Sequence, residues 1–263
     1  MNKLQEIVLE KRKQLENDKK NHPLEMLQQS AYFNRQCASI REYIVGEDKS
    51  GIIAEIKKKS PALGAINTEI KVGTLAKEYT RAGSSALSVL TDFKFFGGCN
   101  ADLTAARENT SIPILRKDFV IDEYQVFEAK SIGADVILLI AAILTKEEIA
   151  NFTDLAHKLG MEVIFEVHAE HELRKVYKNI DVIGVNNRNL ETMQIDIDTS
   201  TSLAKLIPEG FLKISESGIE NPDVLLELKQ HGYAGFLIGS YFMKHTEPGK
   251  ALSDFIQQIN KTI

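Results

Sequence analysis

From Gly51 onward, apolar runs alternate with amphipathic runs eight times, and this alternation limits the folds open to the chain. The apolar runs cover about 51–57, 85–91, 112–116, 134–140, 161–167, 180–185, 211–216 and 234–239. They are rich in Ile, Val and Leu without a clean polar alternation, as is typical of parallel strands covered on both faces. The runs between them, such as those beginning at Val72 and Thr145, are predicted as helices, several of which end at a glycine.

Alternating strands and helices with right-handed crossovers leave two architectures, a closed barrel or an open doubly wound sheet. Eight repeats favour the barrel. An open sheet would carry a glycine-rich turn after its first strand, and the turn here, KKKSPALGAI, contains no GxGxxG. The predicted fold class is therefore α/β, a (β/α)8 TIM barrel over residues 49–263.

Residues 1–48 predict an N-terminal helical extension packed over one end of the barrel. Leu4, Ile7, Val8 and Leu15 fall on one helical stripe among many Lys and Glu residues. A second helical stretch, LEMLQQSAYFNRQCASIREYI, follows Pro23. A partner-binding tail is the alternative interpretation.

Bulk properties predict a cytoplasmic protein with neither a nucleic-acid nor a membrane partner. The net charge of −5 argues against nucleic acid but leaves room for a small anionic ligand. Cys37 and Cys99 belong to no metal or disulfide pattern, which favours free thiols in a reducing compartment. The N-terminus is too charged for a signal peptide, and no run of 18 apolar residues occurs. A monomer is the default expectation.

Six of the apolar runs end in residues that an apolar core would not require. Barrels of this type build their active sites from residues at the C-terminal ends of the strands. The pattern therefore predicts an enzyme. The residues are Glu55 and Lys57, Lys117, Glu166, Asn186 and Arg188, Glu216 with Ser217 and Gly218, and Gly239 with Ser240.

The last two strand ends predict a phosphate site. Such barrels frequently hold phosphate with the loops after strands seven and eight, where Gly permits close backbone approach and Ser adds a donor. Ser217-Gly218 and Gly239-Ser240 occupy these two positions, although Gly-Ser pairs are also ordinary turn residues. Opposing charge is available from Lys57 and Arg188.

Carboxylates and lysines at the other strand ends predict proton transfer around an anionic substrate. Strand alternation points Glu55 and Lys57 into the barrel, as a structural ion pair or a catalytic one. Lys117 is open to three roles: Schiff-base nucleophile, general acid or anion clamp. Glu166 closes an apolar strand, where partial desolvation is expected to raise its pKa. Glu216 is a third carboxylate at the same rim.

Two further pairs of side chains could have a binding role, one to a metal and one to an aromatic substrate. His168 and His171 lie three residues apart, but no third metal ligand accompanies them, so no metal site is expected. Phe95 and Phe96 belong to the core or contact an aromatic substrate.

Taken together, these motifs resemble the indole-3-glycerol phosphate synthase family. The similar stretches occur in the family's order and span the chain, including the helical extension. They are AEIKKKSP (54–61), LTDFKFFGG (90–98), PILRKDF (113–119), EVH (166–168), GVNNRNLET (184–192), ISESGI (214–219) and FLIGS (236–240).

The resemblance implies a decarboxylating, dehydrating ring closure that converts 1-(2-carboxyphenylamino)-1-deoxyribulose 5-phosphate into indole-3-glycerol phosphate without a metal or organic cofactor. By motif, Lys117 is similar to the general acid that protonates the ribulose carbonyl. Glu166 is similar to the general base of the later dehydration. Lys57 and Glu55 resemble a catalytic pair, with Lys57 near the anthranilate carboxylate or the departing hydroxyl.

The resemblance also assigns binding roles. Asn186 and Glu216 are similar to residues that orient the substrate hydroxyls and amine. The implied substrate and phosphate contacts are Lys57, Ser60, Arg188, Ser217, Gly218, Gly239 and Ser240, and the implied aromatic pocket is Phe95, Phe119 and Leu138.

The chain departs from the family pattern in two loops. Ala62-Leu63-Gly64 follows KSP, where the family usually has another Ser and a Lys-Gly. Phe93 stands where an acidic residue is more usual. The remaining alternatives are a Schiff-base aldolase acting on a sugar phosphate and a catalytically inactive phosphate binder. The lysines and carboxylates together argue against the second, because a binder would not need them.

Overall fold

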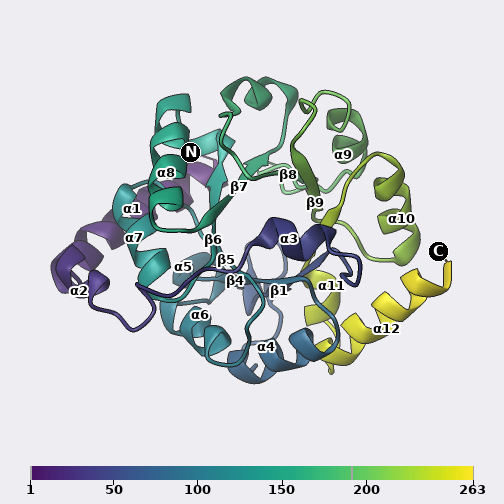
Figure 1. Ribbon diagram of the computed structural model, residues 1–263, viewed down its shortest axis with the longest axis horizontal. Helices are drawn as coiled ribbons and strands as arrows, with labels where there is room; N and C mark the ends of the chain where they lie inside the picture. Colours follow the sequence, from purple (N-terminus) through teal and green to yellow (C-terminus); the bar gives the residue numbers. More distant parts are fainter. Residues whose placement is uncertain (1, 191, 263) are drawn as a thin grey trace.

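The computed structural model describes residues 2–190 and 192–262. Within these residues, eight parallel strands form a closed barrel surrounded by helices (Figure 1). The predicted barrel is confirmed, and the predicted strands differ from the observed ones by a residue or two at their ends. In barrel order the strands are β1 (Ile52–Ile56), β4 (Ala86–Leu90), β5 (Ile114–Lys117), β6 (Val136–Ile140), β7 (Glu162–Val167), β8 (Val182–Asn186), β9 (Leu212–Glu216) and β10 (Gly235–Ile238), which pairs with β1.

Helices connect the strands and begin at recognisable caps. Thr145 forms a capping box with Glu148 at the start of α8, and Asn221 caps α10 ahead of Pro222. Among the described helices, none combines the length and apolarity that crossing a bilayer requires. The connecting helices are α4 (Val72–Arg81), α5 (Phe93–Phe96), α6 (Asn100–Arg107), α7 (Glu123–Ser131), η1 (Ala141–Ile143), α8 (Lys146–Lys158), η2 (Glu170–Lys175), α9 (Asp198–Leu203), α10 (Pro222–Gln230), α11 (Ser240–Met243) and α12 (Pro248–Thr262).

Alternation along each strand separates an inner core from an outer one. On β5, Leu115 packs inside the barrel, whereas Ile114 packs in the outer cluster with the surrounding helices. Successive side chains of a strand point to opposite faces. The same alternation therefore sends Lys117 into the barrel and Arg116 outward. Strand pattern thus decides which charged groups meet at the centre.

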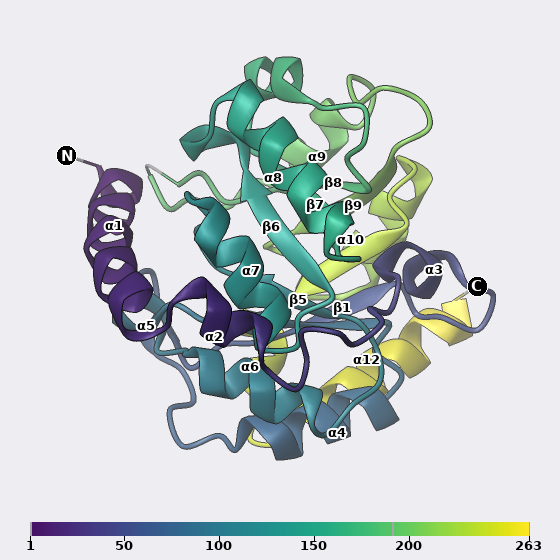
Figure 2. The same cartoon turned by 60° about the vertical axis from the view of Figure 1, so that its left-hand side comes forward.

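The N-terminal segment covers both ends of the barrel, not one as predicted. Helix α1 (Lys3–Asn21) lies at the C-terminal ends of the strands, where the Lys11 ammonium pairs with Asp118 at 2.8 Å. Helix α3 (Ile40–Val45) lies at the opposite end, where the Ile40 backbone N–H donates to Glu162 Oε2 at 2.6 Å. Figure 2 shows the two helices on opposite sides of the barrel.

The predicted second helical stretch is confirmed at its two ends, α2 (Leu24–Gln28) and α3, and is wrong for residues 29–39. Helix α2 is short, and turns and irregular backbone lead from it to α3. The reason is tertiary: the Asp135 carboxylate, just before β6, accepts from the Ala38 backbone N–H at 2.8 Å and from the Arg35 guanidinium. These bonds fix residues 35–38 beside the start of β6 and so compete with a continuous helix.

Candidate active site

A cavity of about 300 Å³ opens at the C-terminal ends of the strands. Residues far apart in the sequence line it, because parallel strands end at the same rim. The predicted site residues that line it are Glu55, Lys57, Ser60, Lys117, Phe119, Leu138, Glu166, Asn186, Arg188, Glu216, Ser217, Gly218, Gly239 and Ser240.

Lys117 makes ion pairs with two buried carboxylates of this cavity. Its Nζ lies 2.5 Å from Glu166 Oε2 and 2.9 Å from Glu216 Oε2, and both carboxylates are almost fully buried. Burial would lower the pKa of Lys117, but Glu166, Glu216 and Glu55 outweigh it and the pKa is raised. The side chain is therefore a charged ammonium at neutral pH, which can donate a proton to a substrate oxygen.

The two carboxylates differ in proton affinity, and the pKa expected for Glu166 is wrong. Burial would raise the pKa of Glu166, but Lys117 and the imidazole of His168 outweigh burial and lower it. Glu216 shows the raised value instead: burial and the charge of Glu166 raise its pKa to about 7, against the attraction of Lys117. The general-base candidate is thus the ionised carboxylate of the pair.

Glu55 and Lys57 form a second buried ion pair on β1 and the residue just beyond it. Lys57 Nζ lies 2.5 Å from Glu55 Oε1, and the Lys57 side chain is 13% exposed. At the end of β10, a Cβ on Gly239 would come within 2.8 Å of Glu55 Cβ and collide with its carboxylate. Glycine at position 239 therefore lets β10 end directly beside the Glu55–Lys57 pair.

The loops after β9 and β10, which the sequence predicts to hold phosphate, line one side of the cavity. Ser217 and Gly218 both have positive φ angles, of 70° and 80°. A non-glycine residue in this region is uncommon and is retained where the surroundings fix it. Asn187 does so here, because its Nδ2 donates to the Ser217 carbonyl at 3.0 Å. A side chain on Gly218 would also meet Ile195, so glycine is needed here, and Gly218 lines the cavity.

Arg188 approaches the cavity from the loop after β8. Its guanidinium donates to the Met193 carbonyl at 3.0 Å, and Arg188 pairs with Ile195 in an isolated antiparallel bridge. Burial lowers its pKa and nearby Glu55 opposes that, but an arginine stays protonated in either case. The loop therefore holds a cation that lines the same cavity as Lys57.

An apolar wall faces these charges. Phe119 and Leu138 line it, and the ring of Phe96 lies 6.1 Å from that of Phe119. Phe95 does not line the cavity, contrary to its predicted place in the aromatic pocket. It is buried beside α1, with the Lys3 ammonium 4.9 Å from its ring centroid. Neighbouring residues of the short helix α5 point in different directions, so Phe96, and not Phe95, lines the cavity.

The sequence did not predict that α1 itself contributes to the cavity. Lys3, Leu4 and Ile7 line the cavity from above the strand ends. The apolar stripe on α1 was the available signal, but it could not say which end of the barrel the helix covers. Tyr241 and Lys244, on or just after α11, also line the cavity and were not predicted.

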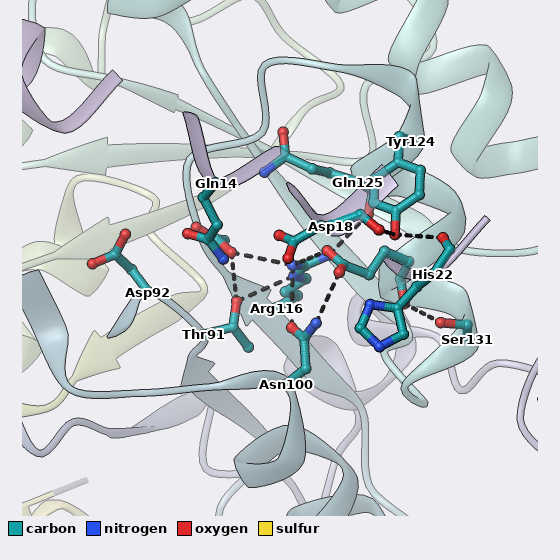
Figure 3. A network of polar contacts seen from close by, with 12 residues as sticks. Gln14, Asp18, His22, Thr91, Asp92, Asn100, Arg116, Tyr124, Gln125 and Ser131 are labelled. Atoms are coloured by element: carbon teal, nitrogen blue, oxygen red, sulfur yellow. Dashed lines mark hydrogen bonds and ion pairs between the residues drawn. The ribbon is translucent and has the colours of Figure 1, made fainter. Parts of the chain in front are cut away.

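A buried polar network fixes the strand that carries Lys117, from the outer side of the barrel (Figure 3). Arg116, 2% exposed, donates to Thr91, Asn100 and the Gln125 carbonyl and pairs with Glu128 and Asp118. Lys11 of α1 joins the same network through Asp118 and Asp92. The network ties α1 to the ends of β4 and β5.

Within the described residues, no group of three or more His, Cys, Asp or Glu side chains is arranged to hold a metal ion. His168 instead lies beside Glu166, with Nε2 3.2 Å from Glu166 Oε1, and Nδ1 is 3.6 Å from Glu172 Oε2.

Comparison with known proteins gives one family. A family model described as indole-3-glycerol phosphate synthase matches residues 4–255. A protein of that name from Bacteroides thetaiotaomicron is 43% identical over 256 residues, which are 97% of this chain and 98% of the relative. Proteins of the same name from Laribacter hongkongensis and Caldanaerobacter subterraneus subsp. tengcongensis are each 40% identical over 95% and 97% of this chain, and over 97% and 98% of their own lengths. The chain belongs to the indole-3-glycerol phosphate synthase family.

Proposed function

We propose that the cavity at the C-terminal ends of the strands performs the family's reaction. This is the decarboxylating and dehydrating ring closure of 1-(2-carboxyphenylamino)-1-deoxyribulose 5-phosphate to indole-3-glycerol phosphate. The observation that carries the proposal is the position of Lys117, a buried ammonium held by Glu166 and Glu216 in the same cavity as the loops after β9 and β10.

Binding comes first. The phosphate is held by the loops at Ser217, Gly218, Gly239 and Ser240, and the aromatic ring packs against Phe119 and Leu138. Anchoring both ends of the substrate turns cyclisation into a positioned intramolecular step, which removes much of the entropic cost. Lys57 and Arg188 face the substrate's anionic groups, and Asn186 orients its hydroxyls.

Ring closure then uses Lys117 as the general acid. Its ammonium protonates the ribulose carbonyl oxygen as the ring carbon attacks, and the resulting hydroxyl remains on the new ring. The cationic, iminium-like intermediate lies near Glu166, whose negative charge stabilises it. Loss of carbon dioxide follows. In the dehydration, Glu166 accepts a proton from the intermediate, and the hydroxyl leaves as water after protonation by a lysine of the site.

A Schiff-base aldolase is disfavoured by the same geometry. A Schiff base requires a neutral amine at Lys117, but the two carboxylates keep this side chain protonated. Borohydride treatment in the presence of ketose phosphates is therefore expected to leave Lys117 unmodified, and a covalent adduct there would overturn the general-acid role.

The direct test is a fluorescence assay for the indole product. The purified protein is expected to convert the carboxyphenylamino substrate into indole-3-glycerol phosphate with release of carbon dioxide and no added metal. Absence of product from folded protein at saturating substrate would refute the proposal.

The proposal includes the organisation of the chain. Residues 1–48 form an extension of a catalytic barrel that covers 49–263. The protein is expected to be a monomer in the cytoplasm. Light scattering of the purified protein at several concentrations tests the monomer, and a mass of twice the chain's 29.4 kDa would contradict it.

A further inference from the structure

The two carboxylates that face Lys117 are close to equivalent when only that lysine is considered. Glu166 and Glu216 contact the same ammonium at 2.5 and 2.9 Å, and their side chains are 2% and 1% exposed. Two buried carboxylates beside one cation share a proton over part of the pH range, and which one holds it depends on their other neighbours.

Those other neighbours differ sharply. The second oxygen of Glu166 lies 3.2 Å from His168 Nε2. The second oxygen of Glu216 is buried and has no hydrogen-bond partner among the described residues. It lies only 2.5 Å from where a Cβ on Gly184 would be, a position that Ile164 and Ile214 also border. The second oxygen of Glu166 therefore faces an imidazole, whereas that of Glu216 lies near Gly184, Ile164 and Ile214.

His168 is itself held by a second carboxylate. Its backbone N–H donates to Glu172 Oε2 at 2.6 Å, and its Nδ1 lies 3.6 Å from the same oxygen. Neither ring nitrogen makes a hydrogen bond within the described residues, but each lies near a carboxylate oxygen, at 3.2 Å and 3.6 Å, so the two carboxylates act on the ring through their charge. Burial would lower the pKa of His168, but Glu166 and Glu172 outweigh it and raise the pKa to about 9. With this raised pKa the ring carries a positive charge at neutral pH.

We propose that His168 is a positioning residue that keeps Glu166 ionised and leaves the proton of the carboxylate pair on Glu216. The role of Glu166 as base rests on the proposed function, whereas the placement of the proton does not. Because the imidazolium is already protonated, it acts on Glu166 through its positive charge and does not accept a proton during the reaction.

Several other charged groups lie around this centre and are present in both the wild type and a His168 variant. Glu172 is the one whose pKa His168 itself lowers, so the comparison reports the loss of the imidazolium together with its effect on Glu172. These groups are Lys117 on β5, Glu55 on β1 acting through Lys117, Glu172 and His171 on η2, and Arg12 and Lys175, which line the adjoining groove with His168.

The test is carbon-13 NMR of protein labelled at the glutamate side-chain carboxyls, with signals assigned by Glu166→Gln and Glu216→Gln. In the wild type, the Glu166 signal should stay ionised from pH 5 to 9 while Glu216 titrates near neutrality. In His168→Gln, Glu166 should take up part of the shared proton, up to about half. A Glu166 that stays fully ionised in this variant, or that titrates near neutrality in the wild type, would overturn the proposal.

Kinetics provide a readout that a merely structural role would not move. His168→Gln should lower kcat by up to about twofold at pH 6, with less loss at pH 9, where both carboxylates are ionised again. An equal loss at every pH would assign His168 a packing role only. His157→Gln is the matched control, because His157 faces Asp181 at 2.8 Å near the start of β7, away from the cavity. It should reproduce the wild-type carboxyl signals and pH profile.

Glu172→Gln keeps the ring in place and covers the case in which His168→Gln does not fold. It should lower the pH at which nitrogen-15 shifts report loss of the His168 proton. An unchanged midpoint, or a wild-type ring that is neutral at pH 7, would refute the proposal. If the wild type turns over substrate and the carboxyl signals ignore His168, only this inference fails. If it makes no product, the proposed function fails while the proton placement can still be measured.

Discussion

At the scale of single residues, the site depends on a lysine whose charge is secured by its neighbours. Lys117 combines burial with two carboxylates at hydrogen-bond distance, so the ammonium form persists well above neutral pH. This suits a general acid better than a nucleophile. The sequence left both roles open, because it shows the lysine at a strand end but not the two carboxylates that converge on it.

Removing either the acid or the base should reduce turnover more than binding. Lys117→Ala and Glu166→Gln are each expected to lose roughly 10²–10⁴ in kcat with a milder change in KM, as is typical when a proton-transfer group is lost. Indole fluorescence kinetics give both parameters. Lys146→Ala and Glu147→Gln, at exposed positions of α8, are the matched controls. Unimpaired turnover in either site variant would refute its role.

Glu216 should make stability depend on pH in a direction opposite to that of most carboxylates. Its pKa is raised to about 7, above the unfolded value near 4.3, so the folded state loses stability as pH rises through this window. The free energy of unfolding of Glu216→Gln, relative to that of the wild type, should therefore be about 2 kcal/mol higher at pH 8 than at pH 5. Urea titrations at both pH values measure this. A difference that is the same at both would contradict the assignment.

The phosphate loops predict a loss of binding without loss of chemistry. Ser240→Asp places a negative charge at the start of α11, where the substrate phosphate is proposed to lie. The expected result is a raised KM with a smaller change in kcat, measured in the same assay. Ser202→Asp, at an exposed position of α9, is the control. A KM equal to the wild-type value would count against this phosphate site.

At the scale of elements, α1 is tied to the barrel mouth by buried charge. Lys11 is 2% exposed and pairs with Asp92 and Asp118, which follow β4 and β5. Burial would raise the pKa of Asp118, but Lys11 and Arg116 lower it to about 2. The Lys11–Asp118 pair therefore persists until strongly acidic pH. They connect a helix that lines the cavity to the strand that carries Lys117.

Breaking this connection should be costly. Lys11→Met leaves two buried aspartates without one of their cations, and such a loss typically costs about 3–5 kcal/mol. Urea unfolding of the variant measures the change in the free energy of unfolding. Lys13→Met, at an exposed position of the same helix, is expected to unfold like the wild type. Equal stability of the two variants would show that the network does not hold α1.

At the scale of the whole molecule, local pattern predicted the barrel and tertiary contacts decided the rest. The eight apolar runs and the polar strand ends are local signals, and β-strand alternation then placed Glu55, Lys57 and Lys117 inside. The path of 29–39, the direction of Phe95 and the lowered pKa of Glu166 depend on partners far away in the sequence, which are Asp135, α1 and Lys117 respectively. No periodicity encodes those contacts.

The most direct test of the central claim is a crystal structure with a substrate analogue whose ribulose carbonyl is reduced to an alcohol. The phosphate is expected between the loops at Gly218 and Ser240, with the aromatic ring against Phe119. Lys117 Nζ should lie within hydrogen-bond distance of the alcohol oxygen. A phosphate bound elsewhere, or a Lys117 ammonium turned away from that oxygen, would contradict the account.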